Sequence, residues 1–415
     1  MKRIVFLLIV GMLVVSGCIP AQLSPQPVRE ATATIFLSPE ASQVANLTRT
    51  PGPVTPLATL TPLLNISSST QQSCIAIKEN SANLQDNKND VVVIAQDKTS
   101  SEIYDKLPSP YLYNLQTGER NLIDGSSFAV SLDKKKLAYV SQDGKLVIAN
   151  SDGVSEKELP FEDIAIIQWL ENGFLVEGYK QLVFMSQETG ERQILNTKLP
   201  SIYDNSDGTL DWNPSVLPNP SISRAVYVAL DDVSYQTYIS LWDLENQKEL
   251  ASVSRGPALS AISNMQPQWS IDGQQVVIAS VENYTNFDVK LVSISNQGNV
   301  KVLWDIPQNI GTINFSLSPD QTKIAFWSPA PTENYDITNL SLYVLDIQTG
   351  LATDYCIISP EIPPQPIWSP GSTKLVVDLR QDLGNSNVVV VDLENKTAIK
   401  IADDAQPVGW MMKEP

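Results

Sequence analysis

A hairpin-forming segment that recurs along the chain constrains the fold more than any other feature of the sequence. Its clearest copy, Leu317 to Gly350, holds an alternating apolar run, a tight polar turn, a second run, a loop and a third run. Alternation with a period of two, broken by turn residues, predicts antiparallel strands. Weaker copies of the first hairpin begin at Val130, Trp169, Trp212, Trp269 and Trp368.

The spacing of these copies predicts the architecture. The anchors follow one another at intervals of 39 to 57 residues, and a last anchor stands at Trp410. Repeats of about 40 to 50 residues with several strands each are typical of propeller blades. Third-strand candidates give a second count of seven, beginning at Tyr111, Lys145, Gln181, Ile239, Lys290, Leu340 and Val388. We therefore predict an all-β fold, a single β-propeller with most simply seven four-stranded blades, six or eight being the alternatives.

The two ends of the repeat array predict how the ring closes. Strand candidates at Val91 to Gln96 and at Tyr111 begin the first blade, but no clear first strand precedes them. The last anchor, Trp410, has no second strand after it. We expect Gln406 to Met411 to complete the first blade, because closure removes the open sheet edges. Residues 74–78 are the alternative source of that strand.

The anchors resemble the repeats of TolB-like propellers and, more distantly, those of WD-repeat propellers. The best matches are Ser318-Pro319-Asp320 and Trp368-Ser369-Pro370, and the resemblance covers about residues 90–411. It implies a fold and says little about activity. Propeller domains of prolyl-peptidase relatives are also similar, but no hydrolase domain follows the repeats here, so peptidase activity is not expected.

Composition excludes several functions. The chain contains no histidine, so Ser-His-Asp catalysis, Cys-His catalysis and His-ligated zinc cannot occur. The formal net charge is −18, and the basic surface that nucleic acid requires is absent. Anionic lipid headgroups repel such a surface, so membrane attachment must have another cause. No nucleic-acid partner is expected.

The first residues predict export and a lipid anchor. Residues 1–17 hold two basic residues and then an apolar run from Ile4 to Val15, too short to span a bilayer but typical of a signal peptide. Val15-Ser16-Gly17-Cys18 resembles the lipobox of bacterial lipoproteins, which implies diacylglycerol attached to Cys18 after cleavage. The alternative is an ordinary secretory signal that leaves Cys18 free. The expected location is extracytoplasmic, on the cell membrane or outer membrane.

A change of composition separates a linker from the propeller. Residues 18–72 are rich in Pro, Thr and Ser, carry few charges and show no sustained period. Prolines there interrupt helices and central strands, so we predict a disordered tether. The predicted domains are therefore a signal peptide (1–17), a lipidated tether (18–72) and the propeller (73–415).

Loop lengths point to the candidate binding surface. In a four-stranded antiparallel blade the first and third connections emerge on one face, and the second connections and interblade links on the other. The former are short, whereas the latter are predicted to be long and to include residues 97–110, 196–211, 231–237, 282–288, 329–339 and 380–387. Four of these loops place a tyrosine beside acidic or amide groups: Tyr104, Tyr235, Tyr284 and Tyr335. With Asp204, Asp207 and Asp211 from residues 196–211, they form an acidic rim for a protein or glycan partner. The alternative is that the tyrosines pack loops on neighbouring blades.

Two further groups of residues are candidates for a metal and a disulfide. Asp204, Asp207 and Asp211 suggest a calcium loop, although their spacing misses the EF-hand pattern, and the alternative is a solvated acidic turn. No other cofactor is expected. Cys74 and Cys356 can pair in an exported protein. Against pairing, one ends the sixth predicted blade and the other precedes the first, with the seventh between them. The alternative is two buried thiols.

Two classes of function remain. The favoured one is a lipid-anchored binding module that contacts an envelope protein or an extracellular ligand and touches the membrane only through its lipid. The alternative is a carboxylate-dependent or metal-dependent propeller enzyme acting on glycans, whose acid pair would have to converge on the central channel. No catalytic residues are assigned. A propeller that serves only as a spacer is a third interpretation.

Overall fold

The computed structural model describes residues 69–79, 90–96, 110–163, 165–178, 181–195, 217–231, 236–257, 267–283, 288–305, 313–329, 339–382 and 385–413. All of them belong to one compact unit, Leu60–Pro415. Every regular element in these ranges is a β-strand. No helix in the described part of the chain is long and apolar enough to cross a membrane.

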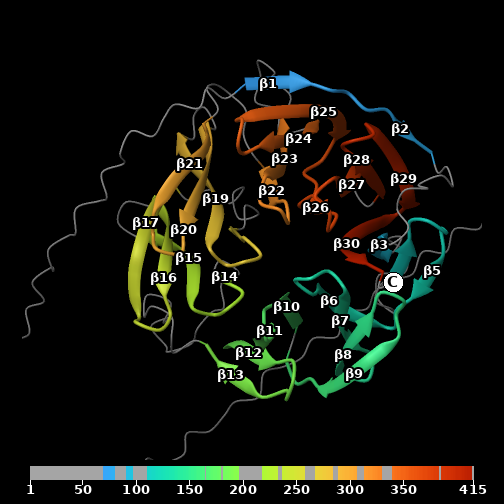
Figure 1. Cartoon of the computed structure of the whole chain (residues 1–415), viewed down its shortest axis with the longest axis vertical. Helices are drawn as coiled ribbons and strands as arrows, with labels where there is room; N and C mark the ends of the chain where they lie inside the picture. Colours follow the sequence, from blue (N-terminus) through green and yellow to red (C-terminus); the bar gives the residue numbers. More distant parts are fainter. Residues whose placement is uncertain are drawn as a thin grey trace, which may run out of the picture. The chain divides into compact units, whose positions relative to one another are not determined.

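The strands form seven sheets, which we call blades and number in chain order around the ring (Figure 1). Blade 1 contains β30 (Ala405–Met412), β3 (Asp90–Gln96), β4 (Tyr111–Asn114) and β5 (Arg120–Leu122). Blade 2 contains β6 (Gly125–Val130), β7 (Lys136–Ser141), β8 (Lys145–Asn150) and β9 (Ser155–Pro160). Blade 3 contains β10 (Ala165–Trp169), β11 (Gly173–Gly178), β12 (Gln181–Ser186) and β13 (Arg192–Ile194).

The remaining four blades follow the same plan. Blade 4 contains β14 (Leu217–Pro218), β15 (Arg224–Asp231), β16 (Gln236–Asp243) and β17 (Lys248–Pro257). Blade 5 contains β18 (Gln268–Trp269), β19 (Gln275–Asn283), β20 (Asp288–Ser295) and β21 (Val300–Asp305). Blade 6 contains β22 (Ile313–Leu317), β23 (Lys323–Pro329), β24 (Leu340–Asp346) and β25 (Leu351–Ser359). Blade 7 contains β26 (Ile367–Trp368), β27 (Lys374–Asp382), β28 (Asn385–Asp392) and β29 (Thr397–Asp403).

The C-terminal strand closes the ring, as predicted. β30 pairs antiparallel with β3 from Asp90 opposite Met412 to Gln96 opposite Ala405, and so takes the inner position of blade 1. The blades approach closely here, since a Cβ on Gly409 would lie 2.4 Å from Cγ2 of Val130 in blade 2. The alternative source of this strand, residues 74–78, is wrong, because β2 (Ile77–Lys78) pairs with β29 instead. The chain is a seven-bladed β-propeller.

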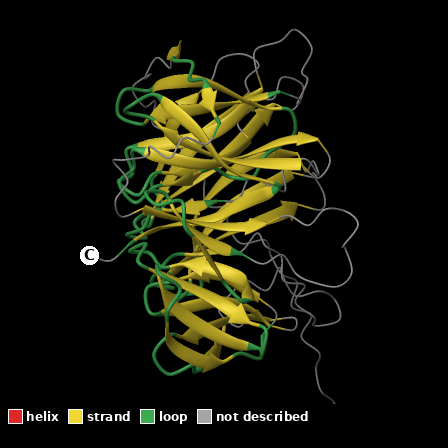
Figure 2. Ribbon diagram, turned by 90° about the vertical axis from the view of Figure 1, so that its right-hand side faces the viewer, coloured by secondary structure: helices red, strands yellow, loops and turns green. Residues whose placement is uncertain are grey.

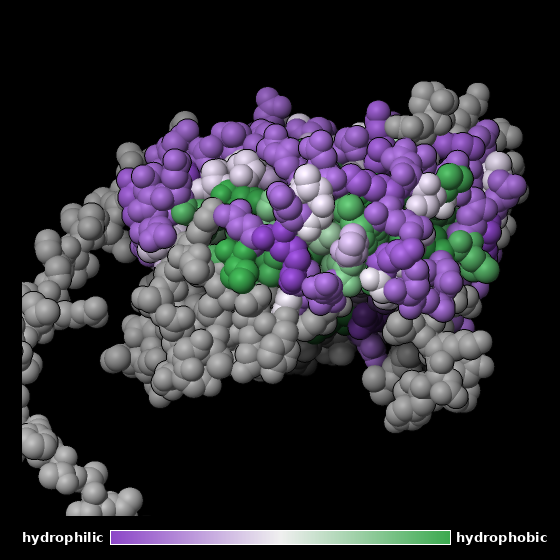
Figure 3. All heavy atoms as spheres, turned by 90° about the horizontal axis from the view of Figure 1, so that it is seen from below, coloured by the Kyte–Doolittle hydropathy of each residue, from purple (hydrophilic) through white to green (hydrophobic). Residues whose placement is uncertain are grey.

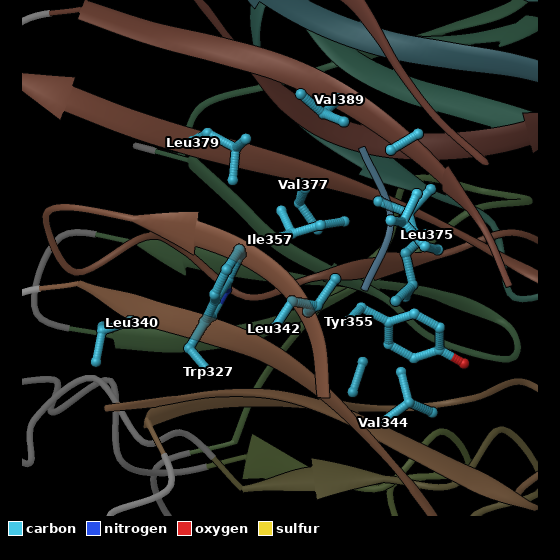
Figure 4. Close-up of a cluster of buried hydrophobic side chains, with 14 of the residues drawn as sticks. Trp327, Leu340, Leu342, Val344, Tyr355, Ile357, Leu375, Val377, Leu379 and Val389 are labelled. Carbon is cyan, nitrogen blue, oxygen red and sulfur yellow. The ribbon is translucent and has the colours of Figure 1, made fainter. Parts of the chain in front are cut away.

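Apolar clusters fill the seven spaces between consecutive blades. Figure 4 shows the cluster between blades 6 and 7, in which the fully buried Trp327 and Leu342 face Leu375 and Val377. The alternating apolar residues of the repeats account for this packing, because each strand presents one side to each neighbouring blade. The repeat tryptophans belong to these clusters at the described anchors Trp169, Trp269, Trp368 and Trp410. Trp212 lies outside the described residues.

An N-terminal segment, residues 69–79, runs along the outer edges of blades 6 and 7, and we call it the strap (Figure 1). β1 (Ser69–Gln72) pairs parallel with β25, and β2 pairs parallel with β29. β1 begins at Ser69, four residues before residue 73, where the sequence analysis places the start of the propeller. Such pairing leaves no local sequence pattern, and so periodicity did not indicate it.

Burial holds the strap only weakly. All four residues of β1 are exposed, and Ile75 is the buried apolar side chain of the segment, at 6% exposure. Burying one such side chain contributes about 1.5–3 kcal/mol, whereas ordering the backbone costs roughly 1–2 kcal/mol per residue. Strand pairing and one buried isoleucine therefore do little more than offset the loss of chain entropy.

In several blades the hairpin between the second and third strands extends further than the sequence predicted. In blade 4 the ladder continues to Asp231 opposite Gln236, and in blade 7 to Asp382 opposite Asn385. The loops predicted at 231–237 and 380–387 are thus shorter than expected. Polar residues there can continue a ladder because outer parts of a blade face solvent on one side.

Candidate functional site

The first connections of the blades are tight turns with a shared hydrogen-bond pattern. In blade 6, Ser318 Oγ donates to Asp320 Oδ1 at 2.6 Å and accepts from Lys323 N at 2.9 Å. Blades 2 and 5 repeat the arrangement, with Ser131 and Asp133, and Ser270 and Asp272. Gln321 has a φ of 61°, as Gly273 at 65° does in the equivalent turn. The serine and aspartate side chains thus form hydrogen bonds within the turn itself.

The same hydrogen bonds tune the turn carboxyl groups. Burial raises the pKa of Asp320, but hydrogen bonds from Ser318 and from the backbone and side chain of Thr322 outweigh it and hold the pKa below its ordinary value. Burial also raises the pKa of Asp272, and hydrogen bonds from Ser270 and from Gln274 N lower it. The net result is again a lowered pKa. Both carboxylates are ionised at neutral pH and stabilise their turns.

The third connections are equally tight. Asp392 Oδ1 accepts hydrogen bonds from Glu394 N at 3.1 Å and Asn395 N at 2.8 Å. Asp243 repeats this in blade 4 with Glu245 N and Asn246 N. Such Asx turns account for the recurrent Asp-Leu-Glu-Asn sequence between third and fourth strands.

First and third turns share one side of the propeller, which we call the turn face. The described loops gather along one side of the molecule in Figure 2. Figure 3 shows polar residues covering the described surface on its upper side, with apolar residues in a band below. The opposite side, where second connections and interblade links begin and end, we call the loop face.

Hydrogen bonds join several neighbouring first turns. Asp320 N donates to Ser372 Oγ at 3.1 Å between blades 6 and 7, and Gln275 Nε2 donates to Gln321 Oε1 at 3.1 Å between blades 5 and 6. Met412 N donates to Lys134 O at 2.7 Å, which links the closing strand to blade 2. On the turn face, these polar groups therefore bind groups of the neighbouring blade.

The predicted binding residues belong to the loop face by their position in the chain. Tyr235, Tyr284 and Tyr335 fall in the second connections of blades 4, 5 and 6, between β15 and β16, β19 and β20, and β23 and β24. Tyr104 falls in the equivalent connection of blade 1, between β3 and β4. All four tyrosines lie outside the described residues, so the tyrosine rim stays a prediction.

The lipidation and calcium predictions also concern residues outside the described ranges. These residues are Cys18, Asp204, Asp207 and Asp211. Within those ranges, no group of three or more Cys, Asp or Glu side chains is placed to hold a metal ion. The calcium loop stays a prediction.

The inner strands carry no ionisable side chains. β30, β6, β10, β14, β18, β22 and β26 contain no Asp, Glu, Lys or Arg. These strands therefore do not supply the acid pair that a glycan-cleaving enzyme needs.

Amide groups bridge the inner parts of blades 5, 6 and 7, which sequence reasoning missed. Gln268 Nε2 donates to Gln365 Oε1 at 2.8 Å, and Gln268 Oε1 accepts from Leu317 N at 3.1 Å. An inner strand has no neighbouring strand on one side, so its backbone groups on that side need other partners. In β22, Gln268 provides one for the N–H of Leu317. A single glutamine before a tryptophan anchor gives no sequence signal for this bridge.

A disulfide between Cys74 and Cys356 fastens the strap to blade 6, with the Cα atoms 4.8 Å apart. The sequence argument against pairing placed blade 7 between the two residues. It fails because the strap passes blade 7 along the outer edge and reaches β25.

The residues beside Cys356 hold it in an irregular part of β25. The buried carboxylate of Asp354 accepts from Ser341 Oγ at 2.5 Å and from Cys356 N at 2.8 Å. Cys356 has a φ of 56°, and the register of β24 and β25 shifts between Ser341 and Tyr343. Burial, followed by the charge of Asp354 and a hydrogen bond to it, raises the pKa of Tyr343 to about 12.

Comparisons with known proteins find only distant structural likenesses. No protein-family model and no curated protein sequence matches the chain. Among solved structures, the chain is similar to TolB from Acinetobacter baumannii, with 13% identity, a TM-score of 0.43, and coverage of 79% of this chain and 66% of that one. A hypothetical selenium-binding protein from Sulfolobus tokodaii gives 9% identity, a TM-score of 0.49, and coverage of 79% and 93%.

An oligogalacturonate lyase in complex with manganese gives 11% identity, a TM-score of 0.46, and coverage of 74% of this chain and 84% of that one. The chain thus spans just under two thirds of the A. baumannii TolB and most of the other two proteins. These likenesses are too distant to indicate an activity for this chain.

Proposed function

We propose that the chain is a lipid-anchored extracytoplasmic binding protein whose propeller presents its loop face to an envelope protein or an extracellular ligand. The Cys18 motif supports the anchor, and the Pro-rich residues before the strap support a tether. The partner is proposed to contact Tyr104, Tyr235, Tyr284 and Tyr335.

The observation that carries the proposal is the difference between the two faces. On the turn face, serine and aspartate side chains are engaged in their own turns and in links to the next blade. On the loop face, chain segments of unequal length separate the strands, for example residues 97–110 between β3 and β4 and residues 330–339 between β23 and β24. Variable loops on a rigid scaffold are where binding residues concentrate.

A crosslinking pull-down from native membranes tests the binding face. The variant carries Tyr235→Ala, Tyr284→Ala and Tyr335→Ala, and a stoichiometric partner of the wild type should be lost from it while the propeller still folds. The matched control changes three exposed third-turn residues, Gln116, Gln348 and Glu394, to Ala on the turn face. That control should keep the partner. Retention by the tyrosine variant, or loss from the control, would overturn the assignment of the loop face.

A separate experiment tests the anchor. Cells that express the wild type and Cys18→Ser are labelled with an alkyne-bearing fatty acid and fractionated. The wild type should carry label and sediment with membranes, whereas the variant should lose both properties. An unlabelled wild type that is released from cells would refute the lipid anchor and leave the propeller assignment untouched.

A further inference from the structure

We propose that the Cys74–Cys356 disulfide is a redox lock on the strap. In the oxidised chain the strap covers the outer edges of β25 and β29. In the reduced chain the strap leaves both edges, and the propeller stays closed. The inference is independent of the proposed binding function, because it concerns only the strap and the blades beneath it.

Besides the pairing of β1 with β25 and of β2 with β29, and the ion pair between Glu79 and Lys400, the non-covalent contacts of the strap are few. Ser73 N donates to Asp354 O at 2.8 Å, and Ile75 N donates to Tyr355 O at 3.1 Å. Gln71 Nε2 donates to Thr353 Oγ1 at 3.0 Å, and both of these groups are exposed. Ile75 alone enters an apolar cluster. Because so little side-chain surface is buried, we infer that the covalent bond holds the strap in place.

The strap is a separate layer from the closed ring. Each of blades 6 and 7 has four strands of its own, and the strap adds a fifth at the outer edge. Closure depends on β30 in blade 1, with Trp410 and Met411 fully buried between neighbouring blades. Loss of the strap therefore removes no strand from the ring and opens no interblade cluster except at Ile75.

The disulfide lies within reach of a reductant. Cys74 is exposed and Cys356 is half-buried. An external dithiol can attack one sulfur as a thiolate, which breaks the S–S bond, forms a mixed disulfide and releases the other cysteine as a thiolate that takes up a proton. The second thiol of the dithiol, as a thiolate, then attacks the mixed disulfide and releases the cysteine still bound to it, which also takes up a proton. The protein gains two electrons and two protons, and the dithiol becomes a disulfide.

Release would also move the point at which the N-terminal part of the chain joins the propeller. In the oxidised chain Ser69 N donates to Gly350 O at 3.4 Å, beside the third turn of blade 6. Without the strap, the first strand of the ring after the N-terminal part is β3, which begins at Asp90 in blade 1. Reduction therefore shifts the junction from blade 6 to blade 1 and uncovers the backbone edge of β25.

Hydrogen exchange with mass analysis tests the lock on the full chain carrying Cys18→Ser, so that one cysteine pair can react. Exchange of residues 69–79 is compared before and after treatment with dithiothreitol, with β30 as the internal reference. Reduction should accelerate exchange at Ser73 and Ile75 by about 100-fold or more, to the rate of an unstructured peptide. β30 should stay protected and exchange faster only by the factor that the loss of global stability sets.

Two outcomes would overturn the proposal. Retained protection of the strap in the reduced chain would show that strand pairing alone holds it. Loss of protection in β30, to the same unstructured-peptide rate as in the strap, would show that the disulfide maintains the ring itself. The double variant Cys74→Ser, Cys356→Ser should behave as the reduced chain with or without dithiothreitol. Any response of that variant to dithiothreitol would mean that the reagent acts elsewhere.

Discussion

The two ends of the described chain both add a strand to a blade built from another part of the sequence, yet different forces hold them. β30 lies at the inner position of blade 1, with Trp410 at 1% and Met411 at 0% exposure. β1 lies at the outer edge of blade 6 with all its residues exposed, and a disulfide follows it. Backbone pairing is common to both. The difference teaches that side-chain burial decides whether an added strand needs a covalent bond.

Deletion of each end should give the largest contrast. Truncation after Asp404 removes β30 and leaves the clusters on both sides of blade 1 open to water. We expect this chain not to fold cooperatively. Removal of residues 1–79 takes away the strap and should leave a folded propeller. Calorimetry of the two truncated chains measures the contrast, and an intact melting transition after the C-terminal truncation would contradict ring closure.

Two buried isoleucines, Ile399 in β29 and Ile75 between β1 and β2, sharpen the comparison. Ile399 is 5% exposed in the cluster between blades 7 and 1, and Ile75 is 6% exposed beneath the strap. Ile399→Ala should lower the free energy of unfolding by about 2–5 kcal/mol, because it leaves a cavity in the ring. Ile75→Ala should change global stability by less than about 1 kcal/mol, because the strap separates locally. Urea denaturation measures the free energy of unfolding of both variants. Equal losses of free energy would show that the strap unfolds together with the ring.

Removal of the disulfide should have the next largest effect on stability. Cys74 and Cys356 are separated by 282 residues, so their bond restricts the unfolded chain strongly. The variant Cys74→Ser, Cys356→Ser should lose about 2–4 kcal/mol of stability in urea and still unfold in one transition. A second, earlier transition detected by tryptophan fluorescence would show that the bond also holds individual blades together.

The smallest effect concerns the end of the strap. Lys400 Nζ lies 2.7 Å from Glu79 Oε2, and hydrogen bonds to Glu79 and then to Asp403 raise the pKa of Lys400. A raised pKa means that the stabilisation is complete below the unfolded value of about 10.4 and is lost as pH rises through the folded value. Exchange at Lys78 and Glu79 should therefore accelerate slightly as pH rises beyond the ordinary lysine value and through the raised pKa of Lys400, after correction for the intrinsic rate.

Glu79→Gln provides the control for this pair. The variant should show the faster exchange at neutral pH and no further alkaline step, and salt should weaken the wild-type pair because Glu79 is 80% exposed. An alkaline step that persists in Glu79→Gln would assign it to another group.

The sequence predicted the ring because its signals are local. Ser-Pro-Asp and Asp-Gly turns need particular side chains and positive φ, and tryptophan anchors recur where blades pack together. The mismatch between the first and last repeats was enough to predict that β30 closes blade 1. These features depend on neighbours in the same hairpin or on a regular repeat.

The strap and the glutamine bridge could not be predicted in the same way. Residues 69–78 have no alternation, and their parallel partners lie 282 residues further along the chain for β1 and 321 for β2. Gln268 reaches Gln365 across blade 6, which no spacing rule anticipates. The tyrosine rim rests on loop position alone, since Tyr104, Tyr235, Tyr284 and Tyr335 lie outside the described residues.

Thiol labelling at two buried positions tests the central claim, that the C-terminal strand is an integral part of the propeller, most directly. Met411→Cys in β30 and Val92→Cys in β3 are each placed in a chain without the three native cysteines, and labelling is followed across urea concentrations. Both side chains are 0% exposed. We predict equal labelling rates with the same steep dependence on urea, because both sites open only by global unfolding. Faster labelling at position 411, with a shallow dependence, would show that β30 frays from a ring that is closed without it.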